Sequence, residues 1–166
     1  GGEVTMKGHR ASLLISGVIM LPMFAAVGGA SQRAREVEHL HAREVEHLRE
    51  RTTWDSVFTP AQAARGESTY AKTCSRCHTA SLAGADEAPA LTGGAFMSGW
   101  NGQTLGELHS RIMGSMPTDT PGVYKRQDVA DVIAYVLNFN AFPAGKTELP
   151  SDDAGLKAIS FVTSKP

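Results

Sequence analysis

The sequence predicts an all-α fold, and three observations support that prediction. Apolar residues recur at helical spacing over residues 104–113 and again after Arg126. Residues that commonly cap helices precede the first of these stretches and an earlier one that begins near Thr59. Within residues 54–146, no alternating apolar run is long enough to form a strand. We therefore expect residues 54–146 to form one helical domain.

The first helix is expected to begin after Thr59 and to continue into the cysteines that follow. Thr59 is a suitable N-cap, Pro60 suits the first helical position, and Gln62 stands where a capping box requires it. Gly66 lies in the middle of this helix, although glycine is a poor helix former. The usual reason is the close approach of another helix, with Tyr70 packing at the same crossing one turn later.

The rest of the domain is expected to alternate loops with two further helices. Glycine, proline and aspartate recur in residues 79–94, which are therefore expected to form a loop. Trp100 is expected in a second glycine-rich turn. Residues 104–113 predict a short helix in which Glu107 completes a capping box. The last helix is expected to begin at Arg126.

The chain is organised around the stretch Cys74-Ser75-Arg76-Cys77-His78, whose C-x-x-C-H order is the attachment signature of a c-type haem. Cys74 and Cys77 stand about one helical turn apart, so that both sulfur atoms can reach the vinyl groups on one edge of a porphyrin. His78 follows directly and is expected to be the proximal ligand of the iron. The expected cofactor is one haem c, bound covalently through Cys74 and Cys77.

Other interpretations of the two cysteines are weaker. A structural zinc site requires a second pair of ligands, and the chain holds only two cysteines. A thioredoxin-like redox pair requires a βαβ pattern that the sequence lacks. A disulfide across two residues would be strained and would close almost no loop.

Residues 1–30 are expected to comprise a signal peptide with a short upstream extension. Lys7 and Arg10 form a positive region, and the apolar residues 11–27 follow it. An uncleaved membrane anchor is the alternative, because the apolar run is barely long enough to span a bilayer. In either case the rest of the chain is expected to be exported to the periplasm.

Two extensions are expected to flank the domain. Residues 31–53 form a charged linker in which an octapeptide occurs twice, over residues 34–41 and 42–49. We expect a helical or disordered spacer there, and a metal site formed by its histidines is the weaker alternative: His39, His41 and His47. The tail, residues 147–166, lacks periodicity, and three apolar residues are expected to dock it on the domain: Leu156, Ile159 and Phe161.

In this order, the helical, haem-binding and loop motifs resemble those of class I cytochromes c. The residues that carry the resemblance lie within about 57–143: Gly66, Tyr70, Cys74 to His78, Ala88 to Leu91, Met116-Pro117 and Tyr135. The resemblance implies three to five helices around one haem, a crossing of the first and last helices at Gly66, and an electron carrier. Some short stretches, such as Phe142-Pro143-Ala144-Gly145-Lys146, are similar in sequence to stretches of the bacterial cytochromes that are associated with quinoprotein dehydrogenases.

The second axial ligand is expected to be Met116, by its position in the family and because Pro117 fixes the backbone beside it. A thioether suits ferrous iron and raises the reduction potential relative to bis-histidine ligation. Met113, Met97 and His109 are the competing candidates.

Three further residues are expected to support the haem, and a fourth is a weaker candidate. The resemblance implies that the carbonyl of Pro89 accepts a hydrogen bond from His78 and that Leu91 packs on the haem face. Trp100 is expected either to donate its indole N–H to a haem propionate or simply to pack in the core. Arg111 is more readily explained as a solvated helix residue than as a propionate counter-ion.

The sequence thus predicts a periplasmic monohaem cytochrome c that carries single electrons and is not an enzyme. The expected partners are redox proteins, with a dehydrogenase as donor and an oxidase or another cytochrome as acceptor. The net charge of −1 and the lack of a basic aromatic patch argue against nucleic acid, and a membrane is involved only if the N-terminal segment is uncleaved. The alternative is a haem enzyme or sensor with an open sixth iron site, for which the sequence offers only His109 as a distal acid–base group.

Overall fold

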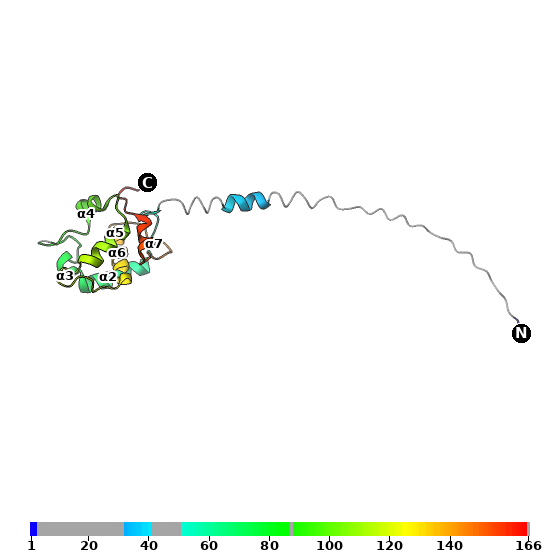
Figure 1. Ribbon diagram of the computed structural model, residues 1–166, viewed down its shortest axis with the longest axis horizontal. Helices are drawn as coiled ribbons and strands as arrows, with labels where there is room; N and C mark the ends of the chain where they lie inside the picture. The colour runs from blue at the N-terminus through cyan, green and yellow to red at the C-terminus, as the bar shows by residue number, and fades with distance from the viewer. Residues whose placement is uncertain (3–31, 41–50, 87, 166) are drawn as a thin grey trace. The chain divides into compact units, whose positions relative to one another are not determined.

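The computed structural model describes residues 1–2, 32–40, 51–86 and 88–165. The chain divides into two units, Gly1–Glu46 and His47–Pro166, and the second holds the helices labelled in Figure 1. Its described elements are, in order, β1 (Arg51–Thr52), α2 (Pro60–Thr73), α3 (Ser75–His78), α4 (Gly93–Trp100), α5 (Leu105–Ser115), α6 (Arg126–Phe139), α7 (Asp153–Lys157) and β2 (Ile159–Ser160). The predicted all-α fold is confirmed, since each strand is only two residues long.

Helix α2 begins as the sequence predicts, with one difference at Gln62. The Thr59 side chain accepts a hydrogen bond from the Gln62 N–H at 3.1 Å, and Pro60 occupies the first helical position. The Gln62 side chain does not reach back to close a capping box. It is fully buried and forms two hydrogen bonds with the backbone of Leu149, donating to its carbonyl at 3.0 Å and accepting from its N–H at 2.7 Å. A long-range contact therefore replaces the predicted local one.

Helices α2 and α6 cross at Gly66, as the sequence predicts. A Cβ atom at Gly66 would lie 1.8 Å from the carbonyl oxygen of Asp131, so that only glycine permits this approach. One turn later the rings of Tyr70 and Tyr135 pack at a centroid distance of 5.2 Å. The crossing fixes the end of α2, and therefore the cysteine motif, relative to α6, whose buried residues extend from Val129 to Leu137.

Helix α4 occupies residues that we expected to form a turn around Trp100. The prediction was wrong because three glycines in eight residues weaken the local helical signal. Packing outweighs that weakness, since Phe96 is buried and meets Phe161 edge to face at 5.8 Å. Helices α5 and α6 begin as predicted, and α5 carries the complete capping box between Thr104 and Glu107.

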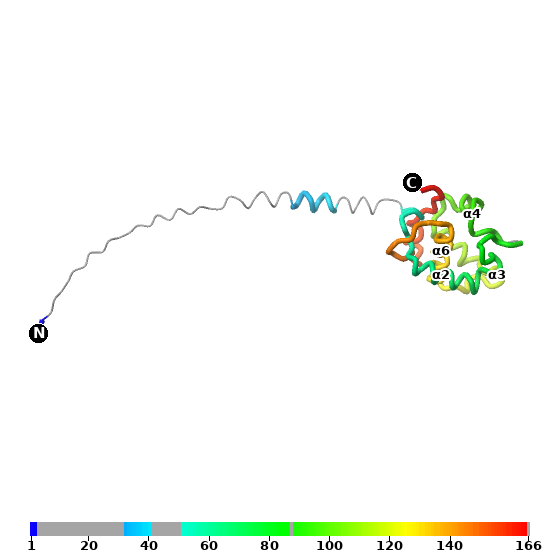
Figure 2. Tube along the Cα trace, turned by 180° about the vertical axis from the view of Figure 1, so that it is seen from behind, coloured from blue at the N-terminus to red at the C-terminus, as the bar shows by residue number. Residues whose placement is uncertain are grey.

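The C-terminal segment packs into the same unit as the helices. Strand β2 pairs in parallel with β1, and the predicted docking residues Leu156, Ile159 and Phe161 are fully buried. Figures 1 and 2 both show this end of the chain beside the segment that precedes α2. Residues from both ends of the unit therefore share one hydrophobic core.

In the first unit, residues 32–40 are helical and exposed, which covers most of the first copy of the octapeptide. The predicted apolar signal region and the second copy lie outside the described residues. Among the residues that the structure describes, no helix has the length and apolar character needed to cross a membrane. No group of three metal-ligating side chains occurs in the same ranges.

Candidate haem site

A cavity of about 1550 Å³ lies in the second unit and is bordered by α3, α4, α5 and α6. This volume exceeds the roughly 300–1,000 Å³ of ordinary small-molecule sites. The lining is mainly apolar, and the aliphatic and phenyl side chains in it include Leu91, Phe96, Leu108, Ile112, Ile133 and Val136. The space suits a large, flat and predominantly apolar group.

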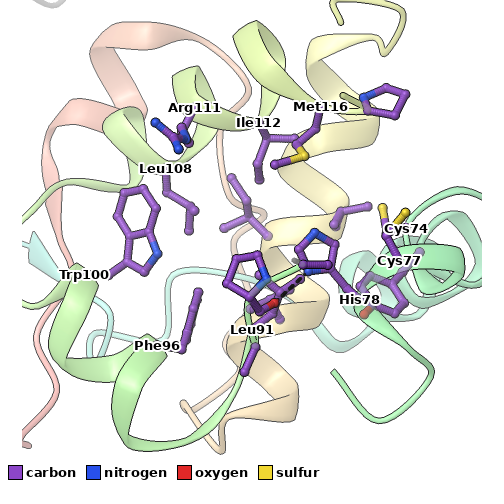
Figure 3. Close-up of a pocket in the computed structure, with 18 of the residues that line it drawn as sticks. Cys74, Cys77, His78, Leu91, Phe96, Trp100, Leu108, Arg111, Ile112 and Met116 are labelled. Atoms are coloured by element: carbon purple, nitrogen blue, oxygen red, sulfur yellow. Dashed lines mark hydrogen bonds between the residues drawn. The ribbon is translucent and has the colours of Figure 1, made fainter. Parts of the chain in front are cut away.

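Cys74 and Cys77 line one end of this cavity as free thiols, and Figure 3 shows their sulfur atoms side by side. The helical backbone brings them together, since the N–H of His78 donates to the carbonyl of Cys74 at 3.0 Å. Burial raises the pKa of the Cys74 thiol, and the contact with the Thr73 hydroxyl opposes this effect only in part. Cys74 therefore lacks the lowered pKa that is typical of the reactive cysteine of a thiol oxidoreductase.

His78 presents one ring nitrogen to the cavity because its other nitrogen is already engaged. Nδ1 lies 2.8 Å from the carbonyl oxygen of Pro89, which is the contact that the sequence comparison with class I cytochromes implied. A carbonyl oxygen only accepts hydrogen bonds, so the neutral ring carries its proton on Nδ1. Nε2 is left with a lone pair available for a metal, in a residue that is 8% exposed.

Met116 caps the C-terminal end of α5 and its side chain points into the cavity (Figure 3). Its N–H donates to the carbonyl of Ile112 at 2.9 Å, which fixes the backbone where the helix ends. The competing candidates do not line the cavity. Met113 and Met97 pack against the hydrophobic core, and Nε2 of the buried His109 lies 3.1 Å from the carbonyl oxygen of Arg126.

A protein-family model matches the part of the chain that holds the cysteine motif and Met116. Residues 61–136 match a family model described as cytochrome c oxidase, cbb3-type, subunit III. Residues 61–136 thus carry a c-type cytochrome domain. Among solved structures, the sulfane dehydrogenase SoxCD from Paracoccus pantotrophus is 21% identical over 54% of this chain and 53% of its own, with a TM-score of 0.39. The match therefore spans about half of each chain, and no curated protein sequence matches.

The cytochrome domain places the remaining predicted site residues around the same cavity. Leu91 is half-buried in its wall, and Asn140 holds the loop there by donating to the Leu91 carbonyl at 3.0 Å. Trp100 also lines the cavity, and its indole N–H has no hydrogen-bond partner within the described ranges. Figure 3 shows Trp100 and Arg111 at the end away from the two cysteines. Arg111 is an exposed residue, as expected, but it too borders the cavity.

Sequence reasoning missed several residues of the site. Phe96 was missed because α4 was not predicted. Asn140 was missed because 49 residues separate it from Leu91, whose carbonyl it contacts. Lys157, from α7, also lines the cavity. No local pattern connects it with the cysteine motif, which lies in another part of the chain.

These residues fit the haem c that a cytochrome c domain implies. Two thiols at one end, an imidazole nitrogen with a free lone pair, a thioether and an apolar lining are the donor set and surroundings that an iron porphyrin requires. When bound, haem supplies one-electron chemistry at its iron, and the protein supplies axial ligands, orientation and exclusion of water. Haem-based electron transfer is therefore the activity of this domain.

Proposed function

We propose that the protein is an exported monohaem cytochrome c that carries single electrons between redox proteins. The observation that carries this proposal is the contact between His78 Nδ1 and the Pro89 carbonyl at 2.8 Å. That contact leaves Nε2 as the available donor inside a mainly apolar cavity to which Met116 also points. Both donors are held by backbone hydrogen bonds of helices, so that little reorganisation is needed when the iron changes its charge.

Covalent attachment of one haem is proposed through Cys74 and Cys77. The chain contains these two cysteines and no others, which suffices for one macrocycle. Each thiol adds across one vinyl group, so that the sulfur bonds to carbon and the thiol proton is transferred to the neighbouring vinyl carbon. The side-by-side arrangement of the two sulfur atoms at the cavity end supports this attachment.

Axial ligation by both His78 and Met116 would close the iron to external ligands and restrict it to outer-sphere electron transfer. The open-site alternative needs a distal acid–base group, and the sequence suggested only His109. Its ring does not border the cavity, and burial lowers the pKa of His109, so that the neutral form is favoured. The carrier is therefore the function that the geometry supports better than an enzyme or a sensor.

The proposed location is the periplasm, with membrane attachment only if the N-terminal segment is retained. The proposed donor is a quinoprotein dehydrogenase, on the resemblance at residues 142–146, and the acceptor is an oxidase or another cytochrome. Over residues 52–166 there are nine basic and eleven acidic residues, so that no strong positive field steers the partner. Docking is expected to be weak and brief, as redox encounters commonly are.

The test is the visible spectrum of the exported full-length protein, after acid–acetone extraction to establish covalent attachment. We expect covalent haem, sharp low-spin reduced bands and the weak sulfur-to-ferric-iron band. Met116→Ala should abolish that weak band and allow carbon monoxide to bind, whereas Met113→Ala, which alters a core methionine outside the cavity, should retain it. High-spin bands and carbon monoxide binding in the unaltered protein would favour the open-site alternative. Extractable haem would exclude covalent attachment.

A further inference from the structure

Three cationic side chains line the cavity, and the structure leaves two of them without a carboxylate partner. Arg76 forms an ion pair with Asp119 at 3.1 Å. Arg111 and Lys157 line the same cavity, and neither has an ion pair within 4 Å among the described residues. An apolar cavity with two unpaired cations at its wall suits a ligand that carries two negative charges.

Lys157 reaches the cavity because α5 offers no side chain at Gly106. A Cβ atom there would lie 2.6 Å from Cγ of Lys157 and 3.1 Å from its backbone nitrogen. The neighbouring residue Leu156 is fully buried and anchors α7 at this place. The backbone of Lys157 is therefore held close against α5.

The nearest acidic group on α5 is already engaged elsewhere. The Glu107 carboxylate accepts hydrogen bonds from the backbone N–H and the hydroxyl of Thr104, which hold the pKa of Glu107 below its ordinary value. Glu107 and Asp153 both feel the charge of Lys157, but neither lies within ion-pair distance of it. The ammonium group therefore stays available to a ligand in the cavity.

The position of the two cations relative to the cysteines matches the chemistry of haem. Haem carries its vinyl groups on one edge and its two propionates on the opposite edge. Attachment at Cys74 and Cys77 therefore directs the propionates toward the far end of the cavity, where Figure 3 shows Trp100 and Arg111. Gly106, over which Lys157 lies, is little more than one helical turn before Arg111 on α5.

We propose that Arg111 and Lys157, the latter from the C-terminal segment, are the two cations that face the two haem propionates, and that the charge of Lys157 raises the reduction potential. Lys157 lies outside residues 61–136, the part that matches the cytochrome family model, so this contribution comes from the extension of this chain. A positive charge near the propionates favours the ferrous form, which carries one positive charge fewer than the ferric form. The inference rests on the proposed haem attachment.

The experiment measures the midpoint potential of the full-length holoprotein in a series that varies only the charge at residue 157. Lys157→Arg should keep the potential, Lys157→Gln should lower it, and Lys157→Glu should lower it further. At a fixed solution potential, we expect the ferrous-to-ferric ratio to fall by roughly two- to fivefold for each unit of charge removed, as for other exposed ion pairs. Lys146→Gln is the matched control, because Lys146 is exposed and does not line the cavity.

The graded order of the three variants separates charge from packing, since a merely structural role would not order them by charge. Potentials for the Lys157 series that coincide with the Lys146→Gln control would overturn the inference while the haem proposal stands. Failure of the unaltered protein to hold covalent haem would overturn the proposed function, and this inference with it.

Discussion

At Gly66 a single missing methyl group determines how the haem domain is assembled. The carbonyl oxygen of Asp131 occupies the space that any other side chain would need. The Asp131 carboxylate, 6% exposed, is held by Arg65 from α2 at 2.9 Å and 3.1 Å and by Gln127. Burial alone would raise the pKa of Asp131, but these hydrogen bonds outweigh it and lower the pKa. Steric fit and charge pairing therefore favour the same register of the two helices.

We predict that Gly66→Ala destabilises the holoprotein by about 1–3 kcal/mol or more, because the added methyl overlaps backbone that cannot move without separating α2 from α6. The free energy of unfolding in urea measures the effect. Gly94→Ala is the control, since Gly94 lies in α4 with nothing within 4 Å of the added atom. That substitution should be neutral or slightly stabilising. Equal effects of the two substitutions would contradict the steric argument.

Among the elements, α3 and the loop after α5 are connected by an ion pair between Arg76, which borders the cavity, and Asp119. Arg76 stands inside the cysteine motif, and Asp119 follows Met116 by three residues. The hydrogen bond from Arg76 lowers the pKa of Asp119 below its ordinary value. Both side chains are exposed, so the pair is a weak and salt-sensitive restraint on the loop that follows Met116.

We expect Asp119→Asn to increase the hydrogen-exchange rate of the Thr120 N–H, which donates to the Pro117 carbonyl at 3.1 Å, by less than about fivefold, because the loop beside Met116 opens more often. Raising the salt concentration should bring the unaltered protein toward the variant. Glu148→Gln removes a comparable exposed partner of Arg65 outside the cavity and serves as the control. Equal rates for all three proteins at low salt would show that the ion pair does not restrain the loop.

The sequence predicts those elements whose signals are local. The capping residues Thr59 and Thr104 indicate where α2 and α5 begin, and the cysteine motif can be recognised because its residues are contiguous. Helix α4 could not be predicted because contacts with distant rings stabilise it against its glycine content. Lys157 enters the candidate site only through the fold, since its place depends on the absence of a side chain at Gly106.

On the scale of the whole molecule, the C-terminal segment, residues 147–166, contributes side chains to the hydrophobic core and is not a separate extension of the domain. Four of its apolar side chains are at most 1% exposed: Leu149, Leu156, Ile159 and Phe161. The backbone of Phe161 exchanges hydrogen bonds with Gln103 at 2.7 Å and Gly102 at 2.9 Å, in the turn that connects α4 with α5. The same segment therefore supports the wall of the cavity that carries Trp100.

This arrangement predicts that removal of residues 147–166 abolishes cooperative folding of the cytochrome domain. Each of the four buried side chains contributes about 1.5–3 kcal/mol, and together they amount to much of the roughly 5–15 kcal/mol by which a domain is stable. The loss also leaves the buried side chain of Gln62 without the two backbone groups of Leu149 that satisfy it. Thermal unfolding followed by circular dichroism should show a broad, weakly cooperative transition for the shortened protein. Removal of residues 164–166 alone should leave the sharp transition unchanged, because Ser164 and Lys165 are exposed. If the shortened protein melted as cooperatively as the full-length one and within a few degrees of it, the segment would be an appendage and not part of the core.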